Sequence, residues 1–316
     1  MKVSSLNRYS LCLSIGIAIL AGCGGSQPLI GAPFSIRTTA QHALPDAQSG
    51  ELLYVTTSNQ EQLYVLRYPQ LQVVDTIGGF SPAALRGLCS GPEGEVYATD
   101  DGQQTSYLYL FKHGAKTPRR VLSGPGGLRA CSVDSTTGDV AVTTVENRPA
   151  LAIFRKGEGR PKLYDVGYGT FTASAYAPDG NLYLIHDCLV LFANGSFTCV
   201  KLAGSASLRG ATGLQWHNGV FIIAAQAHGK LQTVYTVKLT SATTGRLVSK
   251  ITLDRKMNED PRYGLPALLV GNDLMAPSNR KGSLNFWLYP KGGGPVRSAI
   301  LKVDGFIAGL ALSSGN

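Results

Sequence analysis

The sequence predicts an all-β protein, a propeller of six four-stranded blades, on the basis of three observations. A pattern of four short strands recurs along nearly the whole chain at intervals of about 40 to 50 residues, which is typical of β-propellers. Apolar and polar residues alternate between turns that contain Gly and Pro, and no sustained helical periodicity follows residue 50. The end of the chain supplies the one strand that the first repeat lacks. Together these features favour a closed ring over a stack of helical repeats.

The clearest copy of the repeat is the segment Arg86–Gly124. Its four predicted strands are separated by turns and lie at Gly87–Ser90, Glu95–Thr99, Tyr107–Lys112 and Arg119–Leu122. A residue before the second strand marks the register of successive copies, and it is Gly50, Gly94, Gly138, Gly180, Gly219 and, in the sixth copy, Asn272. These marks predict six blades.

The first copy is incomplete, because Glu51–Ile77 matches only the second, third and fourth strands of the repeat. The missing first strand corresponds to Gly309–Gly315 at the other end of the chain, which resembles Gly87–Gly94. We therefore expect both ends of the domain 50–316 to share one blade. This arrangement removes the open sheet edge that an unclosed array would present.

The first 49 residues are predicted to be a leader followed by a tether. Residues 1–22 have a basic start and an apolar run too short to span a bilayer, as in a signal peptide. Leu20–Cys23 resembles the bacterial lipobox, which implies cleavage before Cys23 and its lipidation; an ordinary secretory signal is the alternative. Residues 23–49 are predicted to be a flexible tether, unless Phe34–Arg37 adds a strand to the domain. We expect an exported protein, lipid-anchored to the bacterial membrane on its periplasmic or cell-surface side.

Four cysteines follow Cys23, and an even number in an exported chain suggests disulfides. Cys188 and Cys199 flank a predicted hairpin. A two-residue Asn-Gly turn would place them diagonally, whereas a four-residue loop would place them directly opposite one another. Cys89 and Cys131 are predicted to hold the same repeat position on neighbouring inner strands. We predict both bridges; buried thiols are the alternative.

The loops that follow the second strands and those that lead into the first strands are expected to meet at one mouth of the ring. They carry polar side chains at Asn59, Asp100, Asp101, Glu146, His186, Asp187, His228 and Asn279. Oxygen ligands gathered there could hold a divalent cation such as calcium. Alternatively, these residues are polar only because the loops are exposed to solvent, and no cofactor is then required.

The chain is basic, with 29 Lys and Arg against 20 Asp and Glu, a formal net charge of +9. Many of the basic residues fall on predicted outer strands, where they suit anionic lipid headgroups or acidic envelope polymers, or simply keep the edges solvated. The expected partners are the membrane, through the lipid anchor, and a protein or envelope polymer. Export argues against nucleic acid as a binding partner, and we expect the protein to be a monomer.

The phrases Gly94–Asp100, Cys131–Thr143 and Pro178–Tyr183 resemble NHL-type and SMP-30/gluconolactonase-like six-bladed propellers, above all bacterial lipoproteins of that group. For an enzyme of the group, the resemblance implies a Glu, an Asn and an Asp around a central metal. The chain has no GxSxG, HExxH or P-loop motif. The sequence therefore favours a non-catalytic binding or scaffold module, with a metal-dependent hydrolase working at the mouth as the alternative.

Overall fold

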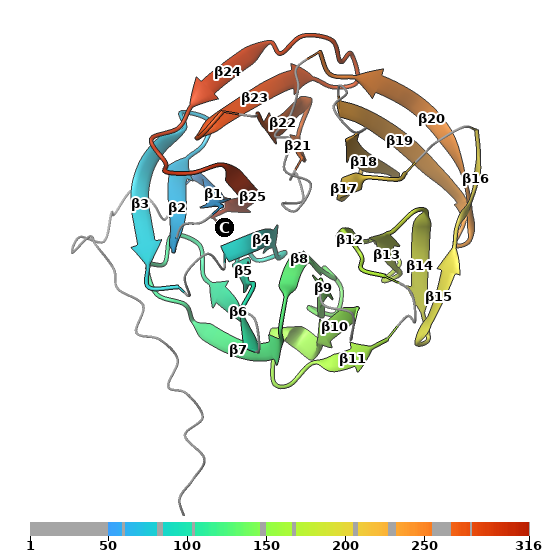
Figure 1. Ribbon diagram of the computed structural model, residues 1–316, viewed down its shortest axis with the longest axis horizontal. Helices are drawn as coiled ribbons and strands as arrows, with labels where there is room; N and C mark the ends of the chain where they lie inside the picture. The colour runs from blue at the N-terminus through green and yellow to red at the C-terminus, as the bar shows by residue number, and fades with distance from the viewer. Residues whose placement is uncertain are drawn as a thin grey trace, which may run out of the picture. The chain divides into compact units, whose positions relative to one another are not determined.

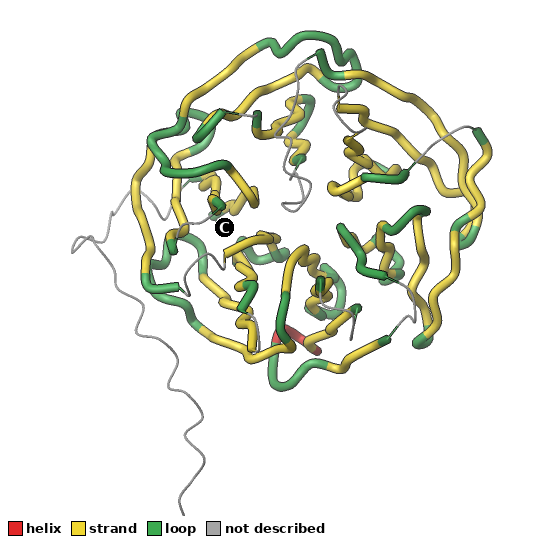
Figure 2. The backbone as a smooth tube through the Cα atoms, viewed as in Figure 1, coloured by secondary structure: helices red, strands yellow, loops and turns green. Residues whose placement is uncertain are grey.

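The computed structural model describes most of the chain after residue 49. The described residues are 50–58, 61–80, 85–102, 105–145, 150–165, 169–204, 208–226, 232–254, 267–278 and 280–315. They form six β-sheets arranged as blades around one axis (Figure 1). Strands make up the blades and turns connect them, and the one helical segment among the described residues is the short η2 (Arg155–Gly157) (Figure 2). Over these ranges no helix is both long enough and apolar enough to cross a bilayer.

The blades on the first half of the ring confirm the predicted four-stranded unit. The blade that joins the chain ends runs outward from the axis through β25 (Ile307–Ser314), β1 (Glu51–Thr57), β2 (Gln62–Arg67) and β3 (Gln72–Gly78). The second blade contains β4 (Leu85–Ser90), β5 (Val96–Asp100), β6 (Thr105–Phe111) and β7 (Arg120–Pro125). The third contains β8 (Leu128–Val133), β9 (Val140–Thr144), β10 (Leu151–Phe154) and β11 (Lys162–Tyr164).

The remaining three blades repeat the unit, with one addition. The fourth contains β12 (Ala173–Tyr176), β13 (Leu182–Ile185), β14 (Leu189–Ala193) and β15 (Ser196–Cys199). The fifth contains β17 (Ala211–His217), β18 (Val220–Gln226), β19 (Gln232–Ser241) and β20 (Thr244–Thr252), and outside these a fifth strand, β16 (Lys201–Ala203). The sixth contains β21 (Leu268–Val270), β22 (Asp273–Pro277), β23 (Ser283–Leu288) and β24 (Arg297–Ile300).

The additional strand β16 departs from the expected four strands per blade. It pairs in parallel with β20, with Leu202 opposite Gly245. β20 would otherwise be the outer edge of its blade, and the chain leaving β15 runs along that edge before it enters β17. Leu202 packs on the apolar cluster between the fourth and fifth blades, so the connecting segment also covers that cluster.

The closure predicted from the chain ends is confirmed. β25 pairs with β1 in antiparallel register, with Leu53 opposite Leu312 and Val55 opposite Leu310. β25 also contacts the second blade, where the hydroxyl of Ser90 on β4 donates a hydrogen bond to the carbonyl of Leu312 on β25 at 2.5 Å. The last strand of the chain therefore belongs to the first blade and ties it to the second.

The core lies between blades. Each of six apolar clusters joins two neighbouring sheets, so every pair of adjacent blades shares one. Trp287, for example, is fully buried between the fifth and sixth blades. Middle strands such as β5 and β9 are buried on both faces along their whole length, because each sheet has a neighbour on either side. The hydrophobic free energy of folding is thus distributed around the ring.

Tyrosine hydroxyls add polar contacts between blades. Tyr54 on β1 accepts a hydrogen bond from the backbone N–H of Gly114 in the second blade at 2.9 Å. Tyr183 on β13 donates to the carbonyl of Ala242 in the fifth blade at 3.1 Å. Burial raises the pKa of both phenols to about 12. Both side chains therefore stay neutral at any physiological pH.

Close backbone contact between inner strands requires Gly87. A Cβ atom at this position would overlap the carbonyl oxygen of Arg129 on β8. The same carbonyl accepts a hydrogen bond from the Thr99 hydroxyl at 2.5 Å, and Thr99 accepts from the Gly87 N–H at 2.8 Å. The second and third blades thus meet at the axis through backbone atoms, with no room for a side chain.

We expect Gly87→Ala to destabilise the ring, because β8 must move away from β4 to admit the methyl group. Such overpacking costs about 1–3 kcal/mol. Gly294→Ala is the matched control, since nothing lies within 4 Å of the Cβ position there. Thermal unfolding followed by circular dichroism should show a melting temperature several degrees lower for Gly87→Ala alone. Equal melting temperatures for the two variants would contradict the close contact.

Candidate ligand channel

The inner strands enclose a cavity of about 680 Å³ on the axis of the ring. Its volume falls in the range of about 300–1,000 Å³ that is usual for small-molecule sites. All six inner strands contribute to its wall. The lining residues are Arg86–Ser90, Arg129–Val133, Val145, Thr170–Tyr176, Thr212–His217, Ala267–Gly271 and Ala308–Leu312.

Polar groups in the wall tie neighbouring inner strands together. The Gln215 side chain on β17 donates to the carbonyl of Leu269 at 3.0 Å and accepts from its N–H at 2.8 Å, so one amide bonds both backbone groups of this β21 residue. The hydroxyls of Ser132 and Ser174 join β8 to β12 at 3.1 Å. Small residues predominate in the wall because the blades are closest to one another at the axis.

Aromatic residues give parts of the wall a rigid apolar surface. Trp216 on β17 packs edge-on against Phe221, with ring centroids 4.8 Å apart. Phe171, just before β12, stacks on Phe197 at 5.4 Å. Burial raises the pKa of Tyr176 well above its usual value, and the charges of Asp139 and Asp134 add to the shift. The Tyr176 phenol therefore stays neutral and can donate a hydrogen bond.

Two arginines stand at the start of neighbouring inner strands and share one carboxylate. Nε of Arg86 lies 3.0 Å from Oδ2 of Asp101, and Nη2 of Arg129 lies 3.3 Å from the same oxygen. The three side chains are largely buried, with exposed fractions of 13% for Arg86, 25% for Arg129 and 14% for Asp101. Both arginines line the cavity. We call Arg86 and Arg129 the arginine pair.

The local structure of the two blades explains this convergence. Leu85 pairs with Asp100 and Leu128 with Thr144, and each arginine is the next residue, at the same point in its blade. A register irregularity follows each arginine, before Leu88 and before Cys131. Asp101 comes directly after β5, between the two inner strands. The arginine pair was not predicted, although the repeated Leu-Arg at the start of two inner strands is a visible signal in the sequence.

The structure describes four of the eight predicted mouth residues, and their side chains do not converge on one point. Asp100 is buried and accepts from the Tyr109 hydroxyl at 3.4 Å, whereas Asp101 binds the arginine pair. His186 and Asp187 face each other only loosely, with Nδ1 3.9 Å from the carboxylate, and Asp187 is 74% exposed. Within the described ranges no three His, Cys, Asp or Glu side chains form a group that could hold a metal ion. Asn59, Glu146, His228 and Asn279 lie outside the described residues.

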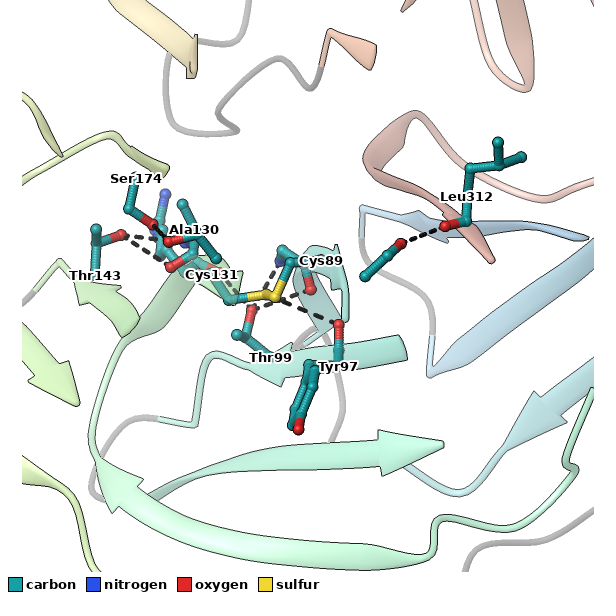
Figure 3. The surroundings of a disulfide bond; sticks show 12 residues. Cys89, Tyr97, Thr99, Ala130, Cys131, Thr143, Ser174 and Leu312 are labelled. Atoms are coloured by element: carbon teal, nitrogen blue, oxygen red, sulfur yellow. Dashed lines mark hydrogen bonds between the residues drawn. A yellow bond between two sulfur atoms is a disulfide. The ribbon is translucent and has the colours of Figure 1, made fainter. Parts of the chain in front are cut away.

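A disulfide joins Cys89 on β4 to Cys131 on β8 in the channel wall, with their Cα atoms 5.6 Å apart (Figure 3). The predicted bridge is therefore confirmed, but its expected register is wrong. Cys89 pairs with Tyr97, whereas Cys131 pairs with Val142, so the residue of β4 that corresponds to Cys131 is Leu88. The bridge links positions one residue apart on the two inner strands.

The second predicted bridge, Cys188–Cys199, is also formed, with Cα atoms 6.1 Å apart. Ala193 pairs with Ser196, so Asn194 and Gly195 form a two-residue turn, and both have positive φ. Cys199 lies opposite Val190, which places Cys188 on the diagonal. The structure therefore selects the diagonal geometry of the two that the sequence left open. The two bridges are typical of an oxidising compartment.

No family model matches the chain, and no curated protein matches it. Solved structures do. A chain in a nidogen/laminin complex has a TM-score of 0.62 at 11% identity, covering 84% of this chain and 100% of that one. A protein of unknown function from Bacteroides caccae has a TM-score of 0.58 at 14% identity, covering 84% of this chain and 99% of that one. The propeller domain of Cps50 (Swd1) from Myceliophteria thermophila has a TM-score of 0.52 at 12% identity, covering 87% of this chain and 92% of that one.

This chain is a β-propeller. The likeness covers most of the chain, and the six sheets around one axis agree with it. At identities of 11–14% these propellers show the fold alone. Any function must therefore be argued from the channel and its residues.

The two disulfides should contribute unequally to stability, because they close loops of different length. The sequence separations are 42 residues for Cys89–Cys131 and 11 for Cys188–Cys199. Loop-closure entropy then gives about 4 and about 3 kcal/mol. We expect Cys89→Ala/Cys131→Ala to lower the free energy of unfolding by about 1 kcal/mol more than Cys188→Ala/Cys199→Ala in urea titrations. The reverse order would contradict this reasoning.

Proposed function

We propose that this propeller is a non-catalytic binding or scaffold module of the bacterial cell envelope, anchored by lipid at Cys23, which holds its ligand in the axial channel. The observation that carries the proposal is the channel itself, a cavity of about 680 Å³. It is concave, bounded by all six inner strands and lined by apolar side chains together with polar groups, some of them fixed by hydrogen bonds. This combination is the usual form of a small-molecule site.

The surroundings of the channel support binding without chemistry. Several of its polar side chains hold the wall together, as Gln215 holds Leu269 and Ser132 bonds Ser174. A rigid wall keeps a binding surface preorganised, which lowers the entropy cost of taking up a ligand. A propeller is also found in a nidogen/laminin complex, which is compatible with this fold serving in molecular recognition.

The metal-dependent hydrolase has no comparable support among the described residues. Asp101 contacts the two arginines of the channel wall. Asp100 is buried against Tyr109, and Asp187 extends into solvent. A lactonase of the kind that the sequence resembles would need a Glu, an Asn and an Asp around one ion, and these described carboxylates do not converge.

Export and anchoring are supported by the lipobox-like Leu20–Cys23 and by the two disulfides. Cys23 itself lies outside the described residues. An anchor of this kind would keep the channel close to the membrane and to envelope polymers. The partner expected at the outer surface is a protein or an acidic envelope polymer.

Filling the channel should abolish ligand binding. Ala130 and Ala267 line the channel and are half-buried, so a tryptophan at either position would occupy its space. We expect at least one compound from a panel of octanoate, 1-octanol, glucose and muramyl dipeptide to raise the melting temperature of the wild type. At a hundred times the dissociation constant a ligand stabilises by about 2.7 kcal/mol, which corresponds to several degrees.

Ala130→Trp and Ala267→Trp should lose this shift, whereas the control Ala242→Trp, in the exposed turn between β19 and β20, should keep it. Differential scanning calorimetry of the free proteins checks that each variant folds. A shift that survives in both channel variants, or a panel with no effect on the wild type, would contradict binding in the channel.

Loss of the Cys23 thiol should release the protein from the membrane. We expect Cys23→Ser, produced in a bacterial host, to move from the membrane fraction to the soluble envelope fraction and to lose incorporation of labelled palmitate. Cys12→Ser is the control, because it lies within the predicted signal peptide. Palmitate incorporation by Cys23→Ser would contradict the proposed anchor.

A further inference from the structure

Two arginines carry charge in the part of the channel wall that the structure describes. Among the described residues that line the cavity, the arginine pair provides two guanidinium groups, and no Asp, Glu or Lys is present. Asp101 contacts both arginines and is not part of the lining. A group that enters the channel therefore meets two guanidinium groups in a largely buried setting, where electrostatic attraction is stronger than in bulk water.

The arginine pair is held in place from three directions. Oδ2 of Asp101 contacts both guanidinium groups, so they surround one oxygen atom. The backbone carbonyl of Arg86 accepts from the Thr56 hydroxyl at 2.7 Å, and that of Arg129 accepts from Thr99 at 2.5 Å. Gly87 lets the Arg129 backbone approach β4. These contacts fix the origin of each side chain and lower the entropy cost of using it in binding.

Apolar side chains also line the channel. Leu88, Leu268 and Trp216 are half-buried and line the cavity. Trp216 is the sixth of the seven residues of β17, whereas each arginine is the second residue of its strand. The inner strands of a propeller run in the same direction along the axis, so positive charge and the indole ring lie toward opposite ends of the channel.

We propose that the arginine pair binds the oxyanion of a small amphipathic acid whose apolar body extends along the channel. The oxyanion is a carboxylate or a phosphate, because the planar guanidinium group matches both. The proposal rests on the proposed function, since it names the ligand class for the same channel. It makes Arg86 and Arg129 binding residues and gives Asp101 the role of positioning them.

A series of eight-carbon probes tests this directly: octanoate, octyl phosphate, 1-octanol and octylammonium. Isothermal titration calorimetry gives the dissociation constants, and Trp216 fluorescence reports occupancy because Trp287, the only other tryptophan, is fully buried. We expect at least one of the two anions to bind the wild type at least tenfold more tightly than 1-octanol and octylammonium. The ratio between octanoate and octyl phosphate identifies the preferred headgroup.

Arg129→Gln should weaken binding of the preferred anion about tenfold, which corresponds to about 1.4 kcal/mol, and leave 1-octanol unchanged. Arg129→Lys keeps the charge without the planar group and should lose only part of the affinity. Arg160→Gln, which removes an exposed arginine far from the inner strands, should behave as wild type. Calorimetric melting confirms the fold of each variant.

Equal affinities for 1-octanol and both anions, or full anion affinity in Arg129→Gln, would overturn the anion site while leaving the channel as a binding site. Anion binding that is as strong in Ala130→Trp as in the wild type would also overturn it, because the anions would then bind elsewhere. Failure of all four probes to bind the wild type would overturn the anion site. If the panel tested above also had no effect, the proposed function would fail with it.

Discussion

The pairing of β25 with β1 is the constraint on which the rest of the structure depends. A propeller blade buries both faces of its sheet, so each blade needs a neighbour on either side. Without β25 the first blade would lack its inner strand, and the channel wall would lose Ala308–Leu312. The ring would also be open between the sixth and second blades. The backbone hydrogen bonds that pair residues 307–314 at one chain end with residues 51–57 at the other therefore hold the whole ring together.

The same closure explains how a binding site can form from backbone geometry. Inner strands that approach as closely as β4 and β8 leave no room for a side chain at Gly87, and the Thr99 hydroxyl bridges the two strands instead. Arg86 and Arg129 are placed next to each other by this contact, not by any flexible loop. Asp101 then offsets part of the repulsion between their like charges. The channel combines this charged end with apolar side chains elsewhere in its wall.

Much of the fold could be predicted because each copy of the repeat needs a residue with positive φ at the same turn. The register glycines Gly94, Gly138, Gly180 and Gly219 all have positive φ, which turns between strands need and which favours glycine. In the sixth copy the positive φ falls on Gly271, one residue earlier, which accounts for Asn272 at the marked position. Strand alternation and the matching chain ends supplied the rest of the architecture.

The site was harder to predict, because it depends on which side chains meet across blades. The repeat does not show that the turn from β8 to β9 is one residue longer than the turn from β4 to β5. This difference shifts Cys131 by one residue relative to Cys89. Loop polarity suggested a ring of ligands that included Asp101 and His186, yet Asp101 contacts arginines from two inner strands. β16 was missed because a strand of three residues in a connection has no periodicity to detect.

The central claim is that β25 is an integral part of the ring and that the ring unfolds as one unit. Native-state hydrogen exchange of the amides in β25, compared with those in β5, β9 and β13, tests it most directly. The account predicts that the paired amides of β25 exchange only through global opening, with the same free energy as the amides of the three middle strands. Rapid exchange throughout β25, while β5, β9 and β13 remain protected, would show that the ring persists without its closing strand and would contradict the account.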